Sequence, residues 1–431
     1  MSFDINRFRI TPDLAYKLLK LIIIHPIQKI RFFEEPSSTI KNSVRRNTEK
    51  RVVEPLIQRQ KDSPGYRMCM LIVTHSCNLN CTYCYESHKS QKQMAPALAK
   101  AIILEELALV QTSEKFEKLE IHFIGGEPFM NFRLIREIVE WLSALKHSVP
   151  VITSCSTNGT LIDDSNKGWL RDHKDILHVI LSYDGDFEMQ RQNRHTTKSQ
   201  IDVQFFIDTW PDYSCHMTIS KETLPKLAHG VLKLQRAGGT LDAAVAQGAD
   251  WTHEDAITYR EQLSILADAY LIDSSLKPIN LLAAGLFGIA EHQQHQRKYC
   301  GTGTSMKTYD VDGRAYPCHM FSPIVCGTER ALKIEQSGIT ENCPITDQSC
   351  EGCNILRWCP TCYGINYHFR GDMSCRDHRL CTMIRTQAIA ACEFQLAYYS
   401  KHVDKLTKAD MAQLKGALNS YHILTQKADE T

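Results

Sequence analysis

The sequence predicts an α/β protein whose strands and helices alternate around a parallel sheet, followed by a cysteine-rich C-terminal region. Two observations support this fold class. Short apolar runs alternate with longer stretches of helical periodicity from Met68 to about residue 272. Eleven of the 17 cysteines then lie between Cys300 and Cys392, where long periodic runs are few. Strand–helix alternation is typical of βαβ units, which are either doubly wound or arranged as a barrel.

Six units fit the alternation, fewer than the eight of a complete (β/α)8 barrel. We expect strands at residues 68–74, 119–124, 151–156, 177–182, 215–220 and 241–246. We expect helices at residues 95–111, 132–145, 163–172, 224–236 and 253–269, with a weaker helix after the fourth strand.

The flanking segments differ from the central region. The first 65 residues are irregular and charged apart from an amphipathic stretch near residues 12–30, and a helix at 383–400 is followed by a polar tail at 404–431. We therefore divide the chain into an N-terminal appendage, a partial barrel, a linker, a cysteine-rich domain, and a C-terminal helix with a polar tail, at residues 1–65, 66–272, 273–299, 300–385 and 386–431.

Composition excludes several classes of protein. The chain is 43% hydrophobic and 23% charged, as is usual for soluble domains. Its charge is 50 − 49 = +1, which gives no reason to expect nucleic-acid binding. No segment approaches the roughly 20 apolar residues of a membrane span, so we expect no membrane partner.

The cysteines are expected to bind metal rather than to pair as disulfides. The N-terminus lacks the pattern of a signal peptide, so we expect a cytoplasmic protein, and cytoplasmic thiols stay reduced. An odd number of cysteines also fits poorly with complete pairing.

Three cysteines follow the first expected strand with the spacing Cys77-x3-Cys81-x2-Cys84. Three thiolates on one short loop suit one face of a cubane iron–sulfur cluster and leave one iron without a protein ligand. Zinc held by three ligands and a water is the alternative.

This loop, with Tyr83 before its last cysteine, resembles the defining motif of radical S-adenosylmethionine (radical SAM) enzymes. The resemblance implies a partial (β/α)6 TIM-like barrel and a catalytic [4Fe–4S] cluster held by Cys77, Cys81 and Cys84. It also implies that S-adenosylmethionine binds the open iron and is cleaved reductively. The resulting 5′-deoxyadenosyl radical abstracts hydrogen from the substrate, and a flavodoxin or ferredoxin is the expected reductant.

Several strand ends resemble the cofactor-binding segments of this family. A Gly-Gly-Glu-Pro sequence ends the second strand, at the edge where α/β barrels place ligands. Arginine suits the methionine carboxylate because it forms charge-assisted hydrogen bonds. The residues expected to bind the cofactor are Tyr83, Gly125, Gly126, Glu127, Pro128, Thr157, Asn158, Ser182, Asp184 and Arg194.

The C-terminal cysteines resemble the SPASM domain, which carries auxiliary clusters in radical SAM enzymes that modify peptides and proteins. Seven cysteines occur in the expected order, with two rather than three residues before Cys362. The resemblance implies two auxiliary [4Fe–4S] clusters, one held by Cys350, Cys353, Cys359 and Cys381 and one by Cys300, Cys318 and Cys362. A zinc ribbon is the alternative, but only five residues separate the Cys-x2-Cys pairs instead of about 15–20.

The Cys300 cluster lacks an evident fourth ligand, because residues 301–317 contain no cysteine. Either Cys326, Cys343 or Cys375 supplies it, or that iron is open to a substrate thiolate.

The substrate is expected to be a peptide or protein. Anaerobic sulfatase maturases carry an Asp after the cysteine that corresponds to Cys318, and this chain has His319 there. The surrounding residues look closer to maturases of ribosomally made peptides, which form thioether or carbon–carbon crosslinks or epimerise residues. The N-terminal appendage is short for a leader-binding domain, so a separate leader-binding protein is expected. A sulfatase maturase and a non-catalytic electron-transfer protein remain the alternatives.

Overall fold

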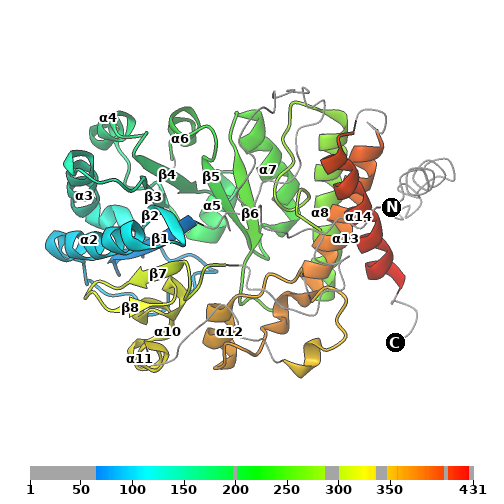
Figure 1. The fold of residues 1–431 in the computed structure, drawn as a ribbon. Coiled ribbons are helices and arrows are strands. Elements are labelled where there is room, and N and C mark those ends of the chain that lie inside the picture. The colour runs from blue at the N-terminus through cyan, green and yellow to red at the C-terminus, as the bar shows by residue number, and fades with distance from the viewer. Residues whose placement is uncertain are drawn as a thin grey trace, which may run out of the picture.

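A parallel sheet surrounded by helices forms the centre of the computed structural model (Figure 1). The structure describes residues 65–197, 201–286, 300–335, 347–356, 358–401 and 406–426. Residues 1–64 of the expected appendage, residues 287–299 of the expected linker and Cys343 lie outside the described residues. The strands are β1 (Gly65–Thr74), β2 (Phe116–Gly125), β3 (Val151–Thr157), β4 (Leu177–Ser182), β5 (Cys215–Ile219), β6 (Leu241–Val245), β7 (Met306–Tyr309) and β8 (Ala315–Tyr316).

Helices follow the strands as the sequence predicts. The helices of the α/β region are α2 (Pro96–Thr112), α3 (Phe132–Ala144), α4 (Asp164–Asp172), α5 (Phe187–Arg194), α6 (Val203–Thr209), α7 (Leu227–Arg236) and α8 (His253–Ile272). Those of the C-terminal region are α10 (Pro323–Cys326), α11 (Thr328–Glu335), α12 (Tyr363–Arg370), α13 (Cys381–Ser400) and α14 (Lys408–Gln426). Within the described residues, no helix combines the length and apolar character that a membrane span requires.

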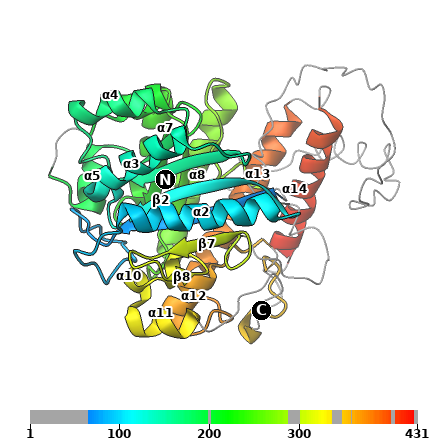
Figure 2. The ribbon, with the colours of Figure 1, turned by 60° about the vertical axis from the view of Figure 1, so that its left-hand side comes forward.

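The sheet has the order β6-β5-β4-β3-β2-β1-β7-β8, and β1 to β6 are parallel throughout. This arrangement confirms the partial barrel of six β/α units. Two further strands extend the sheet beyond the six predicted units, because β7 pairs in parallel with β1 and β8 pairs antiparallel with β7. The cysteine-rich region therefore continues the barrel sheet instead of packing as a separate layer, and Figure 2 shows β7 and β8 below α2.

Burial alternates along β4. Leu177, Val179 and Leu181 are fully buried, whereas His178, Ile180 and Ser182 are half-buried. Side chains alternate between the two faces of a strand, so the buried row packs against the helices and the half-buried row faces inward. The inner face of β4 therefore carries both polar and apolar side chains.

Two buried networks join β7 and its turn to the barrel. Arg67 on β1 donates to both oxygens of Glu106 on α2, at 2.6 and 2.8 Å, and Tyr309 donates to the same carboxylate at 2.6 Å. At the end of β1, His75 Nε2 lies 2.5 Å from the Asp310 carboxylate. Each group is almost fully buried, so breaking one partner would leave the others unpaired.

The expected polar tail at residues 404–431 is wrong for most of its length, because residues 408–426 form helix α14. Helix α14 packs on α13, and α13 packs on α8 (Figure 1). Leu414, Ala417 and Leu424 are buried along one side of α14. The abundant polar residues of this segment hid a helical stripe that tertiary packing stabilises.

Candidate active site

The three-cysteine loop brings the thiols of Cys77 and Cys84 close to that of Cys81. Cys77, Cys81 and Cys84 are each half-buried directly after β1. Burial raises the pKa of Cys81 to about 11, with further raising contributions from the neighbouring Cys84 and Cys77. Burial also raises the pKa of Cys77. Buried thiols such as Cys77 and Cys81 are poor acids, and a bound metal would stabilise their thiolate forms.

The Gly-Gly-Glu-Pro segment packs directly against this loop. A Cβ added to Gly126 would lie 2.4 Å from the backbone oxygen of Ser76. Gly126 N donates to Thr74 O at 3.0 Å, and Glu127 N donates to Ser76 O at 2.8 Å. Only glycine permits this approach, so the end of β2 is fixed against the start of the cysteine loop.

Glu127 ties that segment to the end of β3. Its carboxylate accepts from Phe129 N at 3.0 Å, Thr157 Oγ1 at 2.7 Å and Asn158 N at 2.8 Å. Burial raises the pKa of Glu127, while these three hydrogen bonds act in the opposite direction. The structure thus brings Glu127, Thr157 and Asn158 together, and it uses the Glu127 carboxylate to hold the two strand ends.

Asn158 continues the connection into the cysteine loop. Its Nδ2 donates to Asn78 Oδ1 at 2.9 Å, and Asn78 Nδ2 donates to Thr160 Oγ1 at 2.8 Å. Thr160 in turn donates to Asn158 Oδ1. This closed ring of hydrogen bonds fixes the segment between Cys77 and Cys81.

Asp184 and Arg194 pair with each other. Arg194 Nε and Nη2 each lie 3.0 Å from the Asp184 carboxylate, which also accepts from the Tyr83 hydroxyl at 2.6 Å. The guanidinium lies 5.4 Å from the Tyr83 ring centroid. Its positive charge partly offsets the effect of burial on the pKa of Cys81, which stays raised. The structure therefore places Arg194 beside the three-cysteine loop, with two of its nitrogens engaged by Asp184. Ser182 ends β4 nearby, and its backbone oxygen accepts from Gln190.

A second set of thiols comes from the C-terminal region. Burial raises the pKa of Cys318, and the thiols of Cys362 and Cys300 raise it further, so the three lie close together. The Thr302 hydroxyl lies 2.9 Å from Cys300 Sγ and also hydrogen-bonds Cys318.

The two described candidates for a fourth ligand have other neighbours. Cys326 Sγ lies 3.3 and 3.4 Å from the backbone oxygens of Phe321 and Ser322, and Cys375 hydrogen-bonds Asp372.

A third set contains Cys350, Cys353, Cys359 and Cys381. Burial raises the pKa of Cys350, and the nearby thiols of Cys381 and Cys353 raise it further. Burial likewise raises the pKa of Cys359, and the thiols of Cys350 and Cys353 add to this. Cys353 and Cys381 are exposed, so this four-cysteine set reaches the protein surface.

Tyr85 and His319 lie close to each other and near the first and second sets. Sequence reasoning singled out His319, which stands where sulfatase maturases are expected to carry an Asp, but gave Tyr85 no role. The Tyr85 hydroxyl is 3.2 Å from His319 Nε2. Burial raises the pKa of Tyr85, and the acidic groups that raise it further are Glu86, Cys84, Cys362 and Cys318. The tyrosine therefore lies near both Cys84 and the Cys318 and Cys362 thiols of the second set. Its place directly after Cys84 was a signal that could have found it.

His319 also lies near His122 on β2. Its Nδ1 is buried and has no hydrogen-bond partner among the described residues. Burial lowers the pKa of His319 to about 4, with a smaller contribution from His122 on β2. His122 Nδ1 lies 2.7 Å from Ser154 Oγ, which donates to Glu120 at 2.7 Å. Strand alternation could have placed His122 on the inner face.

Comparisons with known proteins agree with this arrangement. Residues 62–204 match a family of 4Fe–4S single-cluster domains. The chain is 27% identical over 161 residues to the radical SAM cyclopropyl synthase TigE of Paramaledivibacter caminithermalis, covering 34% of this chain and 33% of TigE. It is 31% identical over 137 residues to a cysteine-type anaerobic sulfatase-maturating enzyme of Clostridium perfringens, covering 30% of this chain and 36% of that enzyme. Over about a third of its length, the chain is thus similar in sequence to 4Fe–4S single-cluster domains and to radical SAM enzymes.

Solved structures extend the likeness of fold over most of the chain. The sulfatase maturase anSMEcpe with bound AdoMet superposes with a TM-score of 0.58 at 16% identity, covering 82% of this chain and 99% of that one. The structure of anSMEcpe with bound AdoMet and the Cp18Cys peptide superposes with a TM-score of 0.56 at 16% identity, covering 79% of this chain and 98% of that one. By sequence, the matched regions span about a third to less than half of the length of the curated relatives.

Proposed function

We propose that this protein is a radical SAM maturase that removes a hydrogen atom from a residue of a ribosomally made peptide and so forms a crosslink or inverts a stereocentre. Cys77, Cys81 and Cys84 hold the catalytic [4Fe–4S] cluster, and the C-terminal thiols hold two auxiliary ones. The Gly125–Pro128 segment and the ends of β3 and β4 would hold S-adenosylmethionine, and Arg194 would bind its methionine carboxylate.

The donor chemistry of the chain fits these groups. Each set consists of soft thiol sulfurs, which are the ligands of iron–sulfur clusters, and the first set has three members on one loop. When bound, the cluster and S-adenosylmethionine would supply an electron and a 5′-deoxyadenosyl radical that takes hydrogen from an unactivated carbon. The role of the chain is to place a substrate carbon within reach and to keep water away from it.

The observation that carries the proposal is the position of Tyr85 and His319 near two thiol sets that are more than 200 residues apart in the sequence. A peptide residue held there would lie between the catalytic loop and the Cys318 set. His319 Nδ1, buried and without a partner among the described residues, is the atom that we propose hydrogen-bonds this residue. A separate leader-binding protein and a flavodoxin or ferredoxin complete the system.

Sulfatase maturation is the second candidate, favoured by the likeness of fold to anSMEcpe over 99% of that chain. Against it stands His319, because the resemblance leads us to expect an Asp at this position in a sulfatase maturase. Offering the protein a sulfatase-derived cysteine peptide and the small peptides encoded beside its gene would separate the two. Modification of the sulfatase peptide alone would favour the second candidate.

Cleavage of S-adenosylmethionine tests the proposal. We expect the full chain, reconstituted anaerobically with iron and sulfide and reduced with dithionite, to form 5′-deoxyadenosine. Cys81→Ala should form almost none. Cys392→Ala, which removes a buried thiol on α13 outside the three sets, should form as much as the wild type. No product from the wild type, or equal product from Cys81→Ala, would instead favour a non-catalytic electron-transfer protein.

Iron content is the second readout. Three four-iron clusters correspond to about twelve irons per chain. A value near four would mean that the C-terminal thiols bind something else.

A further inference from the structure

Arg376 is a buried arginine that lies next to the four-cysteine set, five residues before Cys381. Its side chain is only 4% exposed. Among the described residues, neither Nε nor Nη1 has a hydrogen-bond partner, and no carboxylate lies within ion-pair distance of the guanidinium. A buried guanidinium without an anion is strongly destabilising, so an anion is expected beside it.

The groups around Arg376 are thiols. Arg376 hydrogen-bonds the Cys359 thiol, and its charge also acts on Cys350 and Cys381. Three members of the four-cysteine set therefore surround one cation. As neutral thiols they would not compensate its charge, whereas thiolates of a metal centre would.

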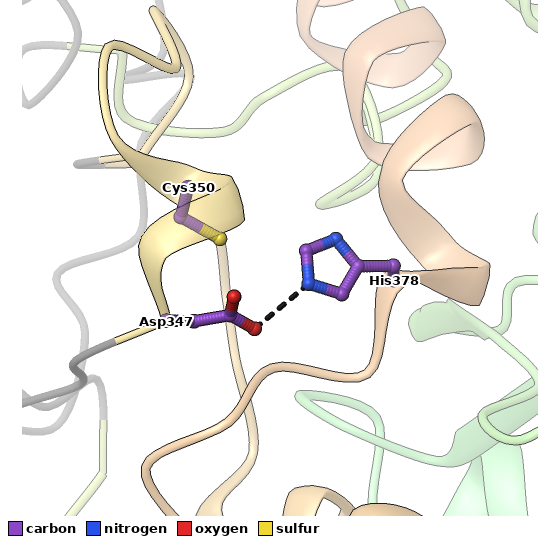
Figure 3. Close-up of side chains that lie close together, drawn as sticks. All are labelled: Asp347, Cys350 and His378. Carbon is purple, nitrogen blue, oxygen red and sulfur yellow. Dashed lines mark hydrogen bonds and ion pairs between the residues drawn. The ribbon is translucent and has the colours of Figure 1, made fainter.

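The loop that carries Arg376 is fixed by Asp347. Asp347 Oδ2 accepts from Arg376 N at 2.9 Å and from His378 Nε2 at 2.8 Å, while Oδ1 accepts from the backbone N–H and hydroxyl of Ser349. Figure 3 shows the His378 ring facing the Asp347 carboxylate beside Cys350. Asp347 thus holds the Arg376 backbone against the turn that carries Cys350, and its oxygens are occupied by these donors.

We propose that Arg376 is a positioning residue that supplies the counter-charge and N–H donors of an anionic centre held by Cys350, Cys353, Cys359 and Cys381. This inference rests on the proposed function, which assigns an iron–sulfur cluster to these thiols. A positive charge and hydrogen bonds to the sulfurs favour the cluster form that has gained an electron. Removing Arg376 should therefore make this centre harder to reduce or prevent it from assembling.

A single metal ion bound by other donors is the competing occupant. Ligand atoms of Asp347, Cys350 and His378 lie within 4.8 Å of one another. A divalent cation there would take the Asp347 carboxylate away from Arg376 N and His378. It would also leave three thiols and the Arg376 charge without partners, and the geometry therefore favours the four-thiolate centre.

The test compares wild type with Arg376→Gln, Arg376→Lys and Arg370→Gln in the full reconstituted chain. Arg370 is exposed at the end of α12 and provides a matched loss of charge away from the thiols. Iron, sulfide and zinc are counted, and each centre is titrated with dithionite while electron paramagnetic resonance is recorded.

We expect Arg376→Gln to lose about four of roughly twelve irons or to shift one centre to a more negative potential. Arg376→Lys should show a smaller shift, and Arg370→Gln none. Wild-type iron content and titration in Arg376→Gln would overturn the inference, as would one zinc in place of four irons in the wild type. If Arg376→Gln fails to fold, the titration of Arg376→Lys decides, and an unshifted centre there overturns it.

Failure of the proposed function has a different signature. In that case the wild type forms no 5′-deoxyadenosine. An active wild type with an unaltered Arg376→Gln variant would refute this inference alone.

Discussion

Gly126 offers a sharp test of how the cofactor segment and the cysteine loop are joined. In Gly126→Ala, the new Cβ would lie 2.4 Å from Ser76 O, 2.7 Å from Ser76 C and 3.0 Å from Cys77 Cβ. Because two of these atoms belong to the backbone, the loop must move. Overpacking of this kind costs about 1–3 kcal/mol. For a domain of this size that corresponds to a melting temperature lower by roughly 2–10 °C.

The matched control is Gly168→Ala in α4, where an added Cβ meets nothing within 4 Å. Replacing a helical glycine by alanine should raise stability by about 0.5–1 kcal/mol. Both variants are followed anaerobically by thermal unfolding and by formation of 5′-deoxyadenosine. We expect Gly126→Ala to be less stable and to lose most of the cleavage, and Gly168→Ala to keep it. Wild-type stability and cleavage in Gly126→Ala would refute the described contact.

Three further predictions follow from the buried contacts. Glu127→Gln replaces a carboxylate oxygen that accepts a hydrogen bond with an amide group that donates one. The lost hydrogen bond costs about 1–3 kcal/mol and loosens the ends of β2 and β3. Binding of S-adenosylmethionine, measured by equilibrium dialysis, should therefore weaken about tenfold or more. Tyr85→Phe removes the hydroxyl next to His319, so S-adenosylmethionine cleavage should persist while peptide modification, followed by mass spectrometry, falls; equal loss of both would contradict its placement. Burial raises the pKa of Glu106, but the hydrogen bonds from Arg67 and Tyr309 outweigh burial, so the pKa in the folded protein is lowered. The ionised carboxylate therefore stabilises the fold at pH values above the ordinary pKa of Glu106. This stabilisation is lost as the pH falls through the lowered pKa of the folded protein. Unfolding followed against pH should show this acid loss in the wild type and less of it in Glu106→Gln.

The first six strands were predictable because each of them has at least one buried face. Such strands appear as short apolar runs, and the six expected ones match β1 to β6 within three residues at each end. In contrast, β7 and β8 contain four and two residues, and pairing with β1 rather than local sequence defines them. Helix α14 did have a local signal, since Thr407 and Asp410 form a reciprocal cap at its start.

The site was predictable to different degrees. Spacing and resemblance identified the cysteines as groups, and those groups do come together in the structure. That they bind clusters stays a prediction. The pairing of Arg194 with Asp184 was not foreseeable, because it depends on how the loops after β4 and α5 fold. The positions of His319 and Arg376 also depend on contacts between segments far apart in the chain.

Transfer of hydrogen from substrate to cofactor tests the central claim most directly. The full chain would be reduced anaerobically with S-adenosylmethionine and a deuterated peptide encoded beside its gene, and the 5′-deoxyadenosine formed would be weighed by mass spectrometry. We expect deuterium from the peptide in the 5′-deoxyadenosine, together with a modified peptide. Unlabelled 5′-deoxyadenosine and an unaltered peptide, for every peptide encoded there, would contradict the proposal that this protein is a peptide maturase.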